Sequence, residues 1–307
     1  MSIVRFYWFS SNALGDLHFL RFSFLFDKSL YFSGCGDIIP MKTYKEGFGM
    51  KEFFGFGGYM RPAEGFLSWQ HLLFVGLMLT AMTVLAVLLS KKNAAGTAKD
   101  KNRVLIAAAL LIDGFELFKI VILCLRQQSA EPILYNLPLF LCSIQLIALP
   151  LAAFTKGRIK EAATDFVCIF GILGAVFGTI GAGQNYNAYP VLSFDNVVSG
   201  ITHSISGFAS LYILFARMAS MKKENIGITF GILLVFCVAA YVANVTIPYN
   251  YMFLMAGDGT PYDILYNLVG GSKLFYPLSV VALFLLYIGL YYWVFYMVTH
   301  KRSKVSC

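Results

Sequence analysis

The apolar stretch over residues 137–154, reading LPLFLCSIQLIALPLAAF, constrains the fold of this chain most strongly. Its length approaches the roughly 20 residues with which a helix crosses the hydrocarbon core of a bilayer. It carries a thiol, Cys142, and an amide, Gln145, one helical turn apart. Pro138 and Pro150 bracket it, and the backbone groups that prolines leave unpaired inside a membrane must be satisfied by other helices or by cavity water. We therefore expect a helix that packs among others and carries the candidate site.

Similar apolar stretches recur along the chain and predict seven membrane-spanning helices. Their predicted ranges are 66–89, 104–125, 137–154, 162–182, 196–219, 226–247 and 274–299. With 58% hydrophobic residues and a mean hydropathy of +0.70, the chain lies outside the range of soluble domains. The predicted fold class is an all-α membrane protein.

The basic residues predict how this protein is oriented in its membrane. They cluster after the first, third, fifth and seventh predicted spans, as Lys91, Lys92, Lys99, Lys101 and Arg103, then Lys156, Arg158 and Lys160, then Arg217, Lys222 and Lys223, and finally Lys301, Arg302 and Lys304. Short clusters of this kind are orientation signals, so the net charge of +8 does not indicate nucleic acid. We expect a multi-pass protein of the cell membrane with its N-terminus outside and its C-terminus in the cytoplasm.

The first 49 residues differ from the rest of the chain. Their apolar part, about residues 17–26, contains His18 and Arg21 and is too short to span a bilayer. The run Lys45-Glu46-Gly47 before Met50 could be encoded by a bacterial ribosome-binding sequence. We therefore hypothesise a bacterial protein that starts at Met50, with residues 1–49 as translated leader and residues 50–307 as one seven-helix domain.

The longest loop between predicted spans, residues 248–273, lies on the predicted outer side. It is rich in Gly, Asn, Asp and Tyr and contains Asn250 and Tyr251. A loop this aromatic and apolar is expected to fold back as a lid or a re-entrant segment rather than to lie in water.

Unusual polar residues recur at one depth of the predicted bundle. At 1.5 Å per residue, Cys142, His203, His71 and Lys119 all lie roughly 8 to 10 Å below the outer surface, and Glu116 roughly 15 Å. Ionisable side chains within spans are costly in lipid and commonly mark functional cavities. The sequence therefore predicts a one-sided cavity near the outer face.

Each of these residues also has a purely structural interpretation. Buried cysteines are usually packing residues, and His71 could be an interfacial anchor. Glu116 and Lys119 stand three residues apart and could form an ion pair, while Asp113 would be protonated or bonded to another helix.

The residue types at this depth suit nucleophilic chemistry. A cysteine becomes a nucleophile when a base or a cation favours its thiolate, and imidazole is the usual partner. Cys142 with His203 could attack a lipid ester, hold the acyl group as a thioester and pass it to a hydroxyl. Gln145, Asn244 or Asn250 could support the oxyanion. No paired ligand spacing indicates zinc, and we expect neither a metal nor a cofactor.

Several motifs together resemble a known family. They are Leu137-Pro138-Leu139 followed by Cys142, the glycine-rich stretch 171–181 with Tyr189-Pro190 after it, His203-Ser204, and residues 250–254. In this order they resemble the YwaF-type bacterial integral membrane proteins, relatives of transmembrane protein 164.

The resemblance implies a membrane-embedded acyltransferase, with phospholipids as acyl donor and acceptor, in which Cys142 is the nucleophile and His203 the base. His71, Glu116, Lys119 and Tyr251 would then support the site. One departure is Phe140, where many bacterial members carry a second histidine; if that histidine assists catalysis, this protein is impaired or relies on His71.

Two other classes remain open, and so does simple hydrolysis of the lipid ester. In a transporter or channel for a small polar solute, the same groups would line a passage, but the inner halves of the spans are mostly apolar. A seven-helix receptor is permitted by the predicted topology, but a retinal-binding one would need a lysine in the last span, where residues 274–299 contain none, and the cytoplasmic loops are short for a signalling receptor. The sequence does not indicate an oligomeric state.

Overall fold

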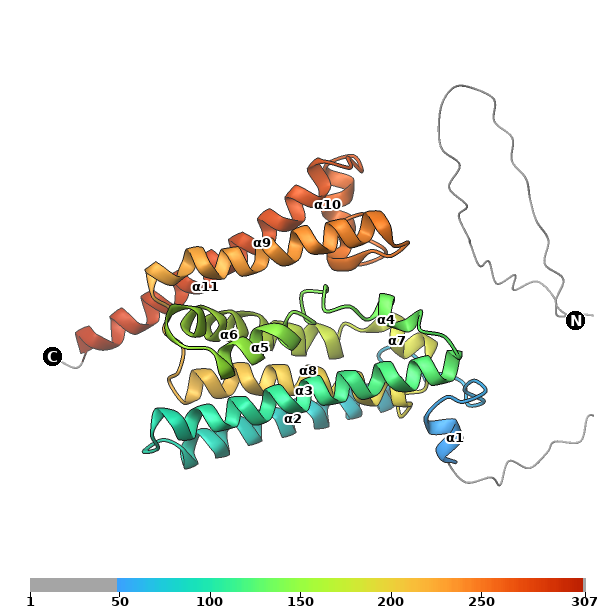
Figure 1. The fold of residues 1–307 in the computed structure, drawn as a ribbon, viewed down its shortest axis with the longest axis horizontal. Coiled ribbons are helices and arrows are strands. Elements are labelled where there is room, and N and C mark those ends of the chain that lie inside the picture. The colour runs from blue at the N-terminus through green and yellow to red at the C-terminus, as the bar shows by residue number, and fades with distance from the viewer. Residues whose placement is uncertain (1–48, 306–307) are drawn as a thin grey trace, which may run out of the picture. The chain divides into compact units, whose positions relative to one another are not determined.

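The structure is a computed structural model that describes residues 49–305. Apart from Gly49, the predicted leader lies outside the described residues, and the start at Met50 stays a prediction. The described chain is helical and contains no strand (Figure 1). Its helices are α1 (Met50–Phe53), α2 (Trp69–Lys92), α3 (Ala98–Gln127), α4 (Pro132–Tyr135), α5 (Gln145–Phe154), α6 (Gly157–Thr179), α7 (Gly183–Ala188), α8 (Phe194–Phe215), α9 (Lys223–Thr246), the 3-10 helix η1 (Tyr251–Phe253), α10 (Asp263–Leu268) and α11 (Phe275–Val305).

Among the described residues, five helical stretches are long and apolar enough to cross a membrane: α2, α6 with α7, α8, α9 and α11. Many large apolar side chains on α2, α9 and α11 are exposed, as expected for helices that face lipid. Helix α3 has 30 residues but carries three charged side chains near its middle, and α5 has only 10 residues. The all-helical membrane fold is confirmed, whereas the count of seven spans is supported for five.

The prediction of one continuous helix over residues 137–154 is wrong. Only Gln145–Phe154 is helical, and residues 137–144 form turns. Pro138 lacks an N–H and disfavours helical geometry in the residue before it, so the helix begins later. The backbone N–H of Gln145 bonds the carbonyl of Cys142 at 3.3 Å. Cys142 therefore lies in the turn that leads into α5.

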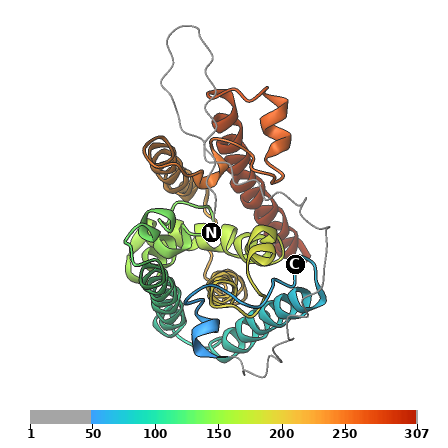
Figure 2. The same cartoon turned by 90° about the vertical axis from the view of Figure 1, so that its right-hand side faces the viewer.

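Viewed along the helices, α8 lies at the centre, enclosed by α2, α3 and α6 (Figure 2). Small residues allow α6 and α8 to approach closely, because a Cβ on Gly171 would lie 2.6 Å from the Ser206 carbonyl oxygen. The Ser210 hydroxyl also donates to the Cys168 carbonyl at 2.6 Å. Helices α6 and α8 thus form a rigid pair on which the site is built.

The loops with the first three basic clusters lie together, and we call this end of the bundle the basic end. Lys101 donates to the carbonyl of Ala216 at 3.0 Å, just past the end of α8. Lys160 donates to the carbonyl of Ala152 at 2.9 Å, in the last turn of α5. Cations are favoured there because the last carbonyls of a helix lack backbone partners and carry partial negative charge.

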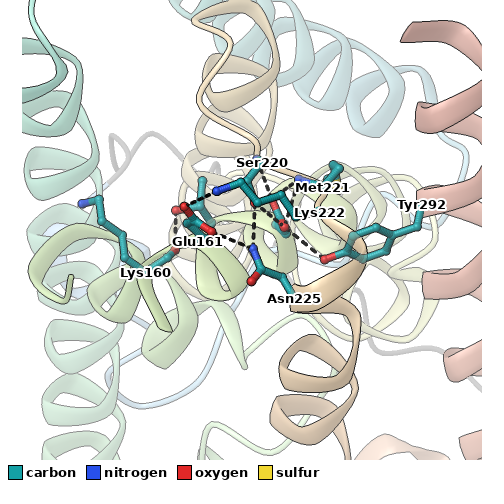
Figure 3. Close-up of polar contacts among 9 residues, drawn as sticks. Lys160, Glu161, Ser220, Met221, Lys222, Asn225 and Tyr292 are labelled. Atoms are coloured by element: carbon teal, nitrogen blue, oxygen red, sulfur yellow. Dashed lines mark hydrogen bonds and ion pairs between the residues drawn. The ribbon is translucent and has the colours of Figure 1, made fainter. Parts of the chain in front are cut away.

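A buried carboxylate, Asp165, holds the loop between α8 and α9 at this end. It accepts the backbone N–H and the hydroxyl of Ser220, both at 2.9 Å, and the hydroxyl of Tyr292 at 3.0 Å. Figure 3 shows Tyr292, Ser220 and Asn225 converging here, and the Asn225 amide donates to the Ser220 hydroxyl at 3.0 Å. Because its oxygens accept donors from the α8–α9 loop and α11, Asp165 joins three elements.

The opposite end carries the loop over residues 247–273, and we call it the lid end. Here the Arg126 guanidinium donates to both carboxylate oxygens of Asp195 at 2.8 Å. The Tyr59 hydroxyl donates to the same carboxylate at 2.5 Å. Burial, with the Asp195 carboxylate as the second cause, raises the pKa of Tyr59 to about 12. These contacts fix residues 49–68 against the ends of α3 and α8.

Candidate functional site

Cys142 and His203 pack on the same face of α6. A Cβ on Gly174 would lie 3.3 Å from the Cβ of Cys142, and a Cβ on Gly178 would overlap the His203 ring. These two glycines stand four residues apart, which is one turn and about 6 Å along the helix. The thiol-bearing turn before α5 and the imidazole of α8 therefore lie on successive turns of α6.

One positive charge acts on both Cys142 and His203. The Lys119 ammonium of α3 interacts electrostatically with the Cys142 thiol and with the His203 imidazole. Lys119 is also 2.6 Å from a carboxylate oxygen of Glu116, so the ion pair that the spacing predicted is present. The side chains of Lys119 and Glu116 are mostly buried, with 19% and 13% exposed, so solvent screens this ion pair poorly. Lys119 thus belongs both to a structural pair and to the surroundings of the thiol.

The His203 ring makes no hydrogen bond to any residue that the structure describes. The neighbouring Ser204 hydroxyl is buried and also lacks a partner there. His203 is half-buried, and its position is set by the flat surface that Gly178 provides. Its ring nitrogens are therefore available to a substrate, a water molecule or the thiol.

Gln145 is fully buried, and neither its amide nitrogen nor its amide oxygen has a hydrogen-bond partner among the described residues. Buried polar groups in native proteins are almost always bonded, so an exception needs an explanation such as an absent water or ligand. Because Gln145 begins the helix that follows Cys142, the two residues are one turn apart along the backbone.

The other two predicted oxyanion donors are occupied. The Asn244 amide donates to the carbonyl of Tyr251 at 2.9 Å and accepts the Tyr251 N–H at 2.7 Å. Asn250 donates to the Ala256 carbonyl at 2.8 Å and accepts the Met255 N–H at 2.9 Å. Both side chains shape the lid-end loop, which leaves Gln145 as the unengaged amide of the three.

The lid-end loop folds back onto the bundle, as its composition predicted. Tyr251, Met252 and Leu254 are buried. The Tyr251 hydroxyl donates to the Leu134 carbonyl, and the Leu137 N–H donates to the same hydroxyl at 3.4 Å. The loop therefore holds the non-helical turn that carries the thiol.

Two aromatic contacts bring this loop to the edge of the thiol site. Phe140, two residues before Cys142, packs against the rings of Tyr251 and Phe253 at 5.2 and 5.9 Å between centroids. Burial raises the pKa of Tyr262, in the same loop, to about 12, and the electrostatic influence of Cys142 is a smaller cause. The loop thus packs aromatic side chains against Phe140, two residues before Cys142.

His71 is fully buried and uses both ring nitrogens. Nδ1 accepts the Leu67 N–H at 3.1 Å, and Nε2 lies 3.3 Å from the Thr179 carbonyl oxygen. The ring also packs against Tyr186 with 3.9 Å between centroids. These contacts tie the start of α2 to the end of α6 and fit the anchor interpretation rather than catalysis.

The remaining cysteines of the bundle lie in other surroundings. Cys168 contacts the Tyr291 hydroxyl at 3.6 Å, Cys237 contacts the Met252 sulfur at 3.8 Å, and both are buried. Cys124 and Cys142 are half-buried.

Asp113 has one buried oxygen without a partner among the described residues. Among the residues that the structure describes, no group of three or more His, Cys, Asp or Glu side chains could hold a metal ion.

Reasoning from the sequence missed Gly174, Gly178 and Tyr262. The four-residue spacing of the two glycines inside an apolar stretch was a usable signal, because small residues at that spacing mark close helix contacts. No signal in the sequence linked Tyr262 to Cys142.

Comparison with known proteins supports one family. The model of the TMEM164 family matches residues 66–299, which include the site described above. No curated protein and no solved structure matches the chain. The match spans most of the chain and agrees with the resemblance inferred from its motifs, although it does not resolve the YwaF-type subgroup. The chain belongs to the TMEM164 family.

Proposed function

We propose that the protein is a membrane-embedded acyltransferase that acts on phospholipid esters, with Cys142 as nucleophile and His203 as general base. The observation that carries the proposal is the packing of these two side chains on successive turns of α6. Family membership and the buried, unpaired amide of Gln145 support it.

In the first half of the proposed reaction, the imidazole of His203 takes the thiol proton and the sulfur of Cys142 attacks the ester carbonyl. The carbonyl oxygen becomes an oxyanion, which the Gln145 amide N–H stabilises. The C–O bond to glycerol then breaks, and the leaving oxygen takes the proton from His203. A lysophospholipid departs, and the acyl group remains as a thioester.

In the second half, a hydroxyl of a lysophospholipid acceptor gives its proton to His203 and attacks the thioester carbonyl. The C–S bond breaks, and the sulfur recovers the proton from His203. Lys119 favours the charged thiolate in both halves, because a nearby cation stabilises an anion. With water as acceptor, the same steps release a fatty acid.

We further propose that α3 and the 137–154 segment complete seven membrane passages in the cell membrane. The N-terminus would lie outside and the C-terminus in the cytoplasm. Helix α3 could cross because the ion pair of Glu116 and Lys119 near its middle is mostly buried.

The test is an acyl-transfer assay with purified protein, a diacyl phospholipid and a lysophospholipid that carries a distinguishable headgroup. Mass spectrometry would measure both the new lysophospholipid and the new diacyl product. We expect the parent to form both and the Cys142→Ala and His203→Ala variants to fall to background. Gly178→Ala should lower the rate as well, because the added methyl would displace the His203 ring.

The matched control is Cys124→Ala, which removes another half-buried cysteine and should keep the parent rate. If Cys142→Ala instead keeps the parent rate, the thiol is a packing residue. If neither the parent nor Cys142→Ala forms any product, a transporter for a small polar solute is the better assignment for the same buried polar groups.

A further inference from the structure

Two carboxylates of the lid-end loop lack a cationic partner. Asp258 and Asp263 form no ion pair within the part of the chain that the structure describes. The Asp258 carboxylate accepts the Asn250 amide at 2.6 Å, and the Asp263 carboxylate accepts no hydrogen bond from a described residue. Neighbouring charges of one sign raise the local concentration of opposite charge, so this pair favours a positively charged ligand.

The turn over residues 257–263 brings the two carboxylates together. A Cβ on Gly257 would overlap Oδ1 of Asp263, so the Asp263 side chain lies against the residue that precedes Asp258. The Thr260 hydroxyl donates to the Gly257 carbonyl at 2.5 Å, and the Asp263 N–H donates to the Thr260 carbonyl at 2.9 Å. These bonds fix the turn, and both negative charges are therefore held on one part of the loop.

A buried hydroxyl without a partner lies beside this turn. Tyr276 is 1% exposed, and its hydroxyl makes no hydrogen bond to any described residue. It interacts electrostatically with both carboxylates. The Tyr276 ring packs edge-to-face against Tyr266 at 5.1 Å, and Tyr266 stands three residues after Asp263 on the same face of α10. A buried polar group that lacks a partner points to an absent ligand or water, and the carboxylates favour a cation in that place.

Aromatic contacts connect this turn to the turn that carries the thiol. Phe140, two residues before Cys142, packs against Phe253 with 5.9 Å between centroids, and Phe253 stacks on Tyr262 at 5.4 Å. Tyr262 directly precedes Asp263. The headgroup region of one leaflet lies outside the hydrocarbon core and is about 5 to 8 Å thick. A phospholipid whose ester lies at Cys142 would therefore present its headgroup to the lid-end loop.

We propose that Asp258, Asp263 and Tyr276 bind the ammonium group of a phospholipid headgroup, ethanolamine or choline, and so select the lipids that reach the thiol. The inference deepens the proposed function and rests on it. Opposite charge supplies the attraction, and a tyrosine ring beside a cation adds to it. The Tyr276 hydroxyl can accept a hydrogen bond from a primary ammonium, whereas choline has no N–H to donate. Lipids that carry only negative charge, such as phosphatidylglycerol, are repelled by the two carboxylates.

Isosteric substitutions remove these groups one at a time. Asp263→Asn removes one negative charge and keeps the size of the side chain. Glu52→Gln is the matched control, because it removes one carboxylate elsewhere at the lid end. Asp258→Asn should act like Asp263→Asn and gives a second route to the same result. Tyr276→Phe removes only a hydroxyl that has no partner, so it should not lower the stability of the fold.

The binding experiment uses these variants in the Cys142→Ala protein, so that it does not depend on acyl transfer. Purified protein is equilibrated with an equimolar mixture of phosphatidylethanolamine, phosphatidylcholine and phosphatidylglycerol that carry identical acyl chains, and native mass spectrometry measures the bound lipids. We expect Asp263→Asn to lower the ratio of bound phosphatidylethanolamine to phosphatidylglycerol about tenfold, because a hydrogen bond to a charged group supplies about that factor. Glu52→Gln should leave the ratio unchanged. Equal ratios in the two variants would overturn the inference.

Tyr276→Phe separates the two headgroups that carry an ammonium. It should lower the ratio of bound phosphatidylethanolamine to phosphatidylcholine, because only ethanolamine donates to the hydroxyl. An unchanged ratio would remove Tyr276 from the site.

The transfer assay distinguishes failure of this inference from failure of the proposed function. Preferential binding of ammonium lipids without any acyl transfer by the parent would support the headgroup site and contradict only the proposed function. Transfer from phosphatidylglycerol as fast as from phosphatidylethanolamine would overturn the headgroup site and leave the proposed function in place.

Discussion

At the scale of single residues, the unpaired amide of Gln145 lowers the stability of the fold but suits the proposed catalysis. A buried amide with neither end bonded costs about 1–3 kcal/mol for each lost partner. A chain retains such a group where a ligand supplies the missing partner, and here that partner would be the oxyanion formed beside Cys142.

Gln145→Leu tests this directly. Leucine has a similar size and needs no hydrogen bonds, so we expect the unfolding free energy to rise by about 1–3 kcal/mol. The acyl-transfer rate should fall by about 10²–10³-fold, as when one oxyanion donor is removed elsewhere. Thermal unfolding in detergent and the transfer assay would measure the two effects. A variant that is more stable and equally active would show that Gln145 plays no part in catalysis.

The sequence placed Cys142 and His203 at one depth, and both side chains pack against α6, but it could not rank the candidate amides or histidines. The side chains of Asn244 and Asn250 already make hydrogen bonds within the lid-end loop, and His71 already bonds between α2 and α6. Residue type and depth decide only which groups could meet. Which of these groups remain without a hydrogen bond depends on the bonds made by the loops. The spacing of apolar residues in the sequence does not predict those bonds.

At the scale of elements, the turn before α5 and the lid-end loop act as one unit. Within the turn, the Ile144 N–H bonds the Phe140 carbonyl at 3.0 Å, and the Tyr251 hydroxyl and ring add contacts from the loop. Composition predicted that the loop folds back, because its aromatic residues need burial. Its anchor, the double hydrogen bond between Asn244 and the Tyr251 backbone, could not be predicted from composition.

Asn244→Ala should release this loop. It removes two hydrogen bonds to the Tyr251 backbone and leaves a buried N–H and a buried carbonyl unpaired, which we expect to lower the unfolding free energy by about 2–4 kcal/mol. Hydrogen exchange of residues 250–254 should become faster. Thr246→Ala is the control, because the Thr246 hydroxyl bonds only carbonyls of its own helix. Equal exchange in the two variants would contradict the anchor.

At the scale of the whole molecule, the described part of the chain has two chemically different ends. The first three basic clusters were predicted to share one side of the membrane, and their loops are joined through contacts such as those of Lys101 and Lys160. The aromatic loop and the candidate site lie toward the other end. The positions of the basic residues predicted this division. The apolar stretch 137–154, by contrast, predicted a longer helix than α5, because hydropathy does not reveal the turn after Pro138.

Orientation in the membrane can be measured with single added cysteines. Lys156→Cys lies at the basic end and Asp258→Cys in the lid-end loop. In intact cells, a membrane-impermeant maleimide should label the protein with Asp258→Cys above the parent background. The protein with Lys156→Cys should react only after the cells are opened, because basic loops face the cytoplasm. The reverse pattern would place the site on the cytoplasmic side.

The proposed mechanism requires that Cys142 carries an acyl group between its two halves. The most direct measurement is the intact mass of the purified protein after incubation with a phospholipid of defined chains, before and after hydroxylamine. We expect the parent and Cys124→Ala to gain the mass of one acyl group, to lose it to hydroxylamine, and Cys142→Ala to gain none. An adduct of equal amount on Cys142→Ala, or none on any variant while the lipid is turned over, would contradict the thioester mechanism.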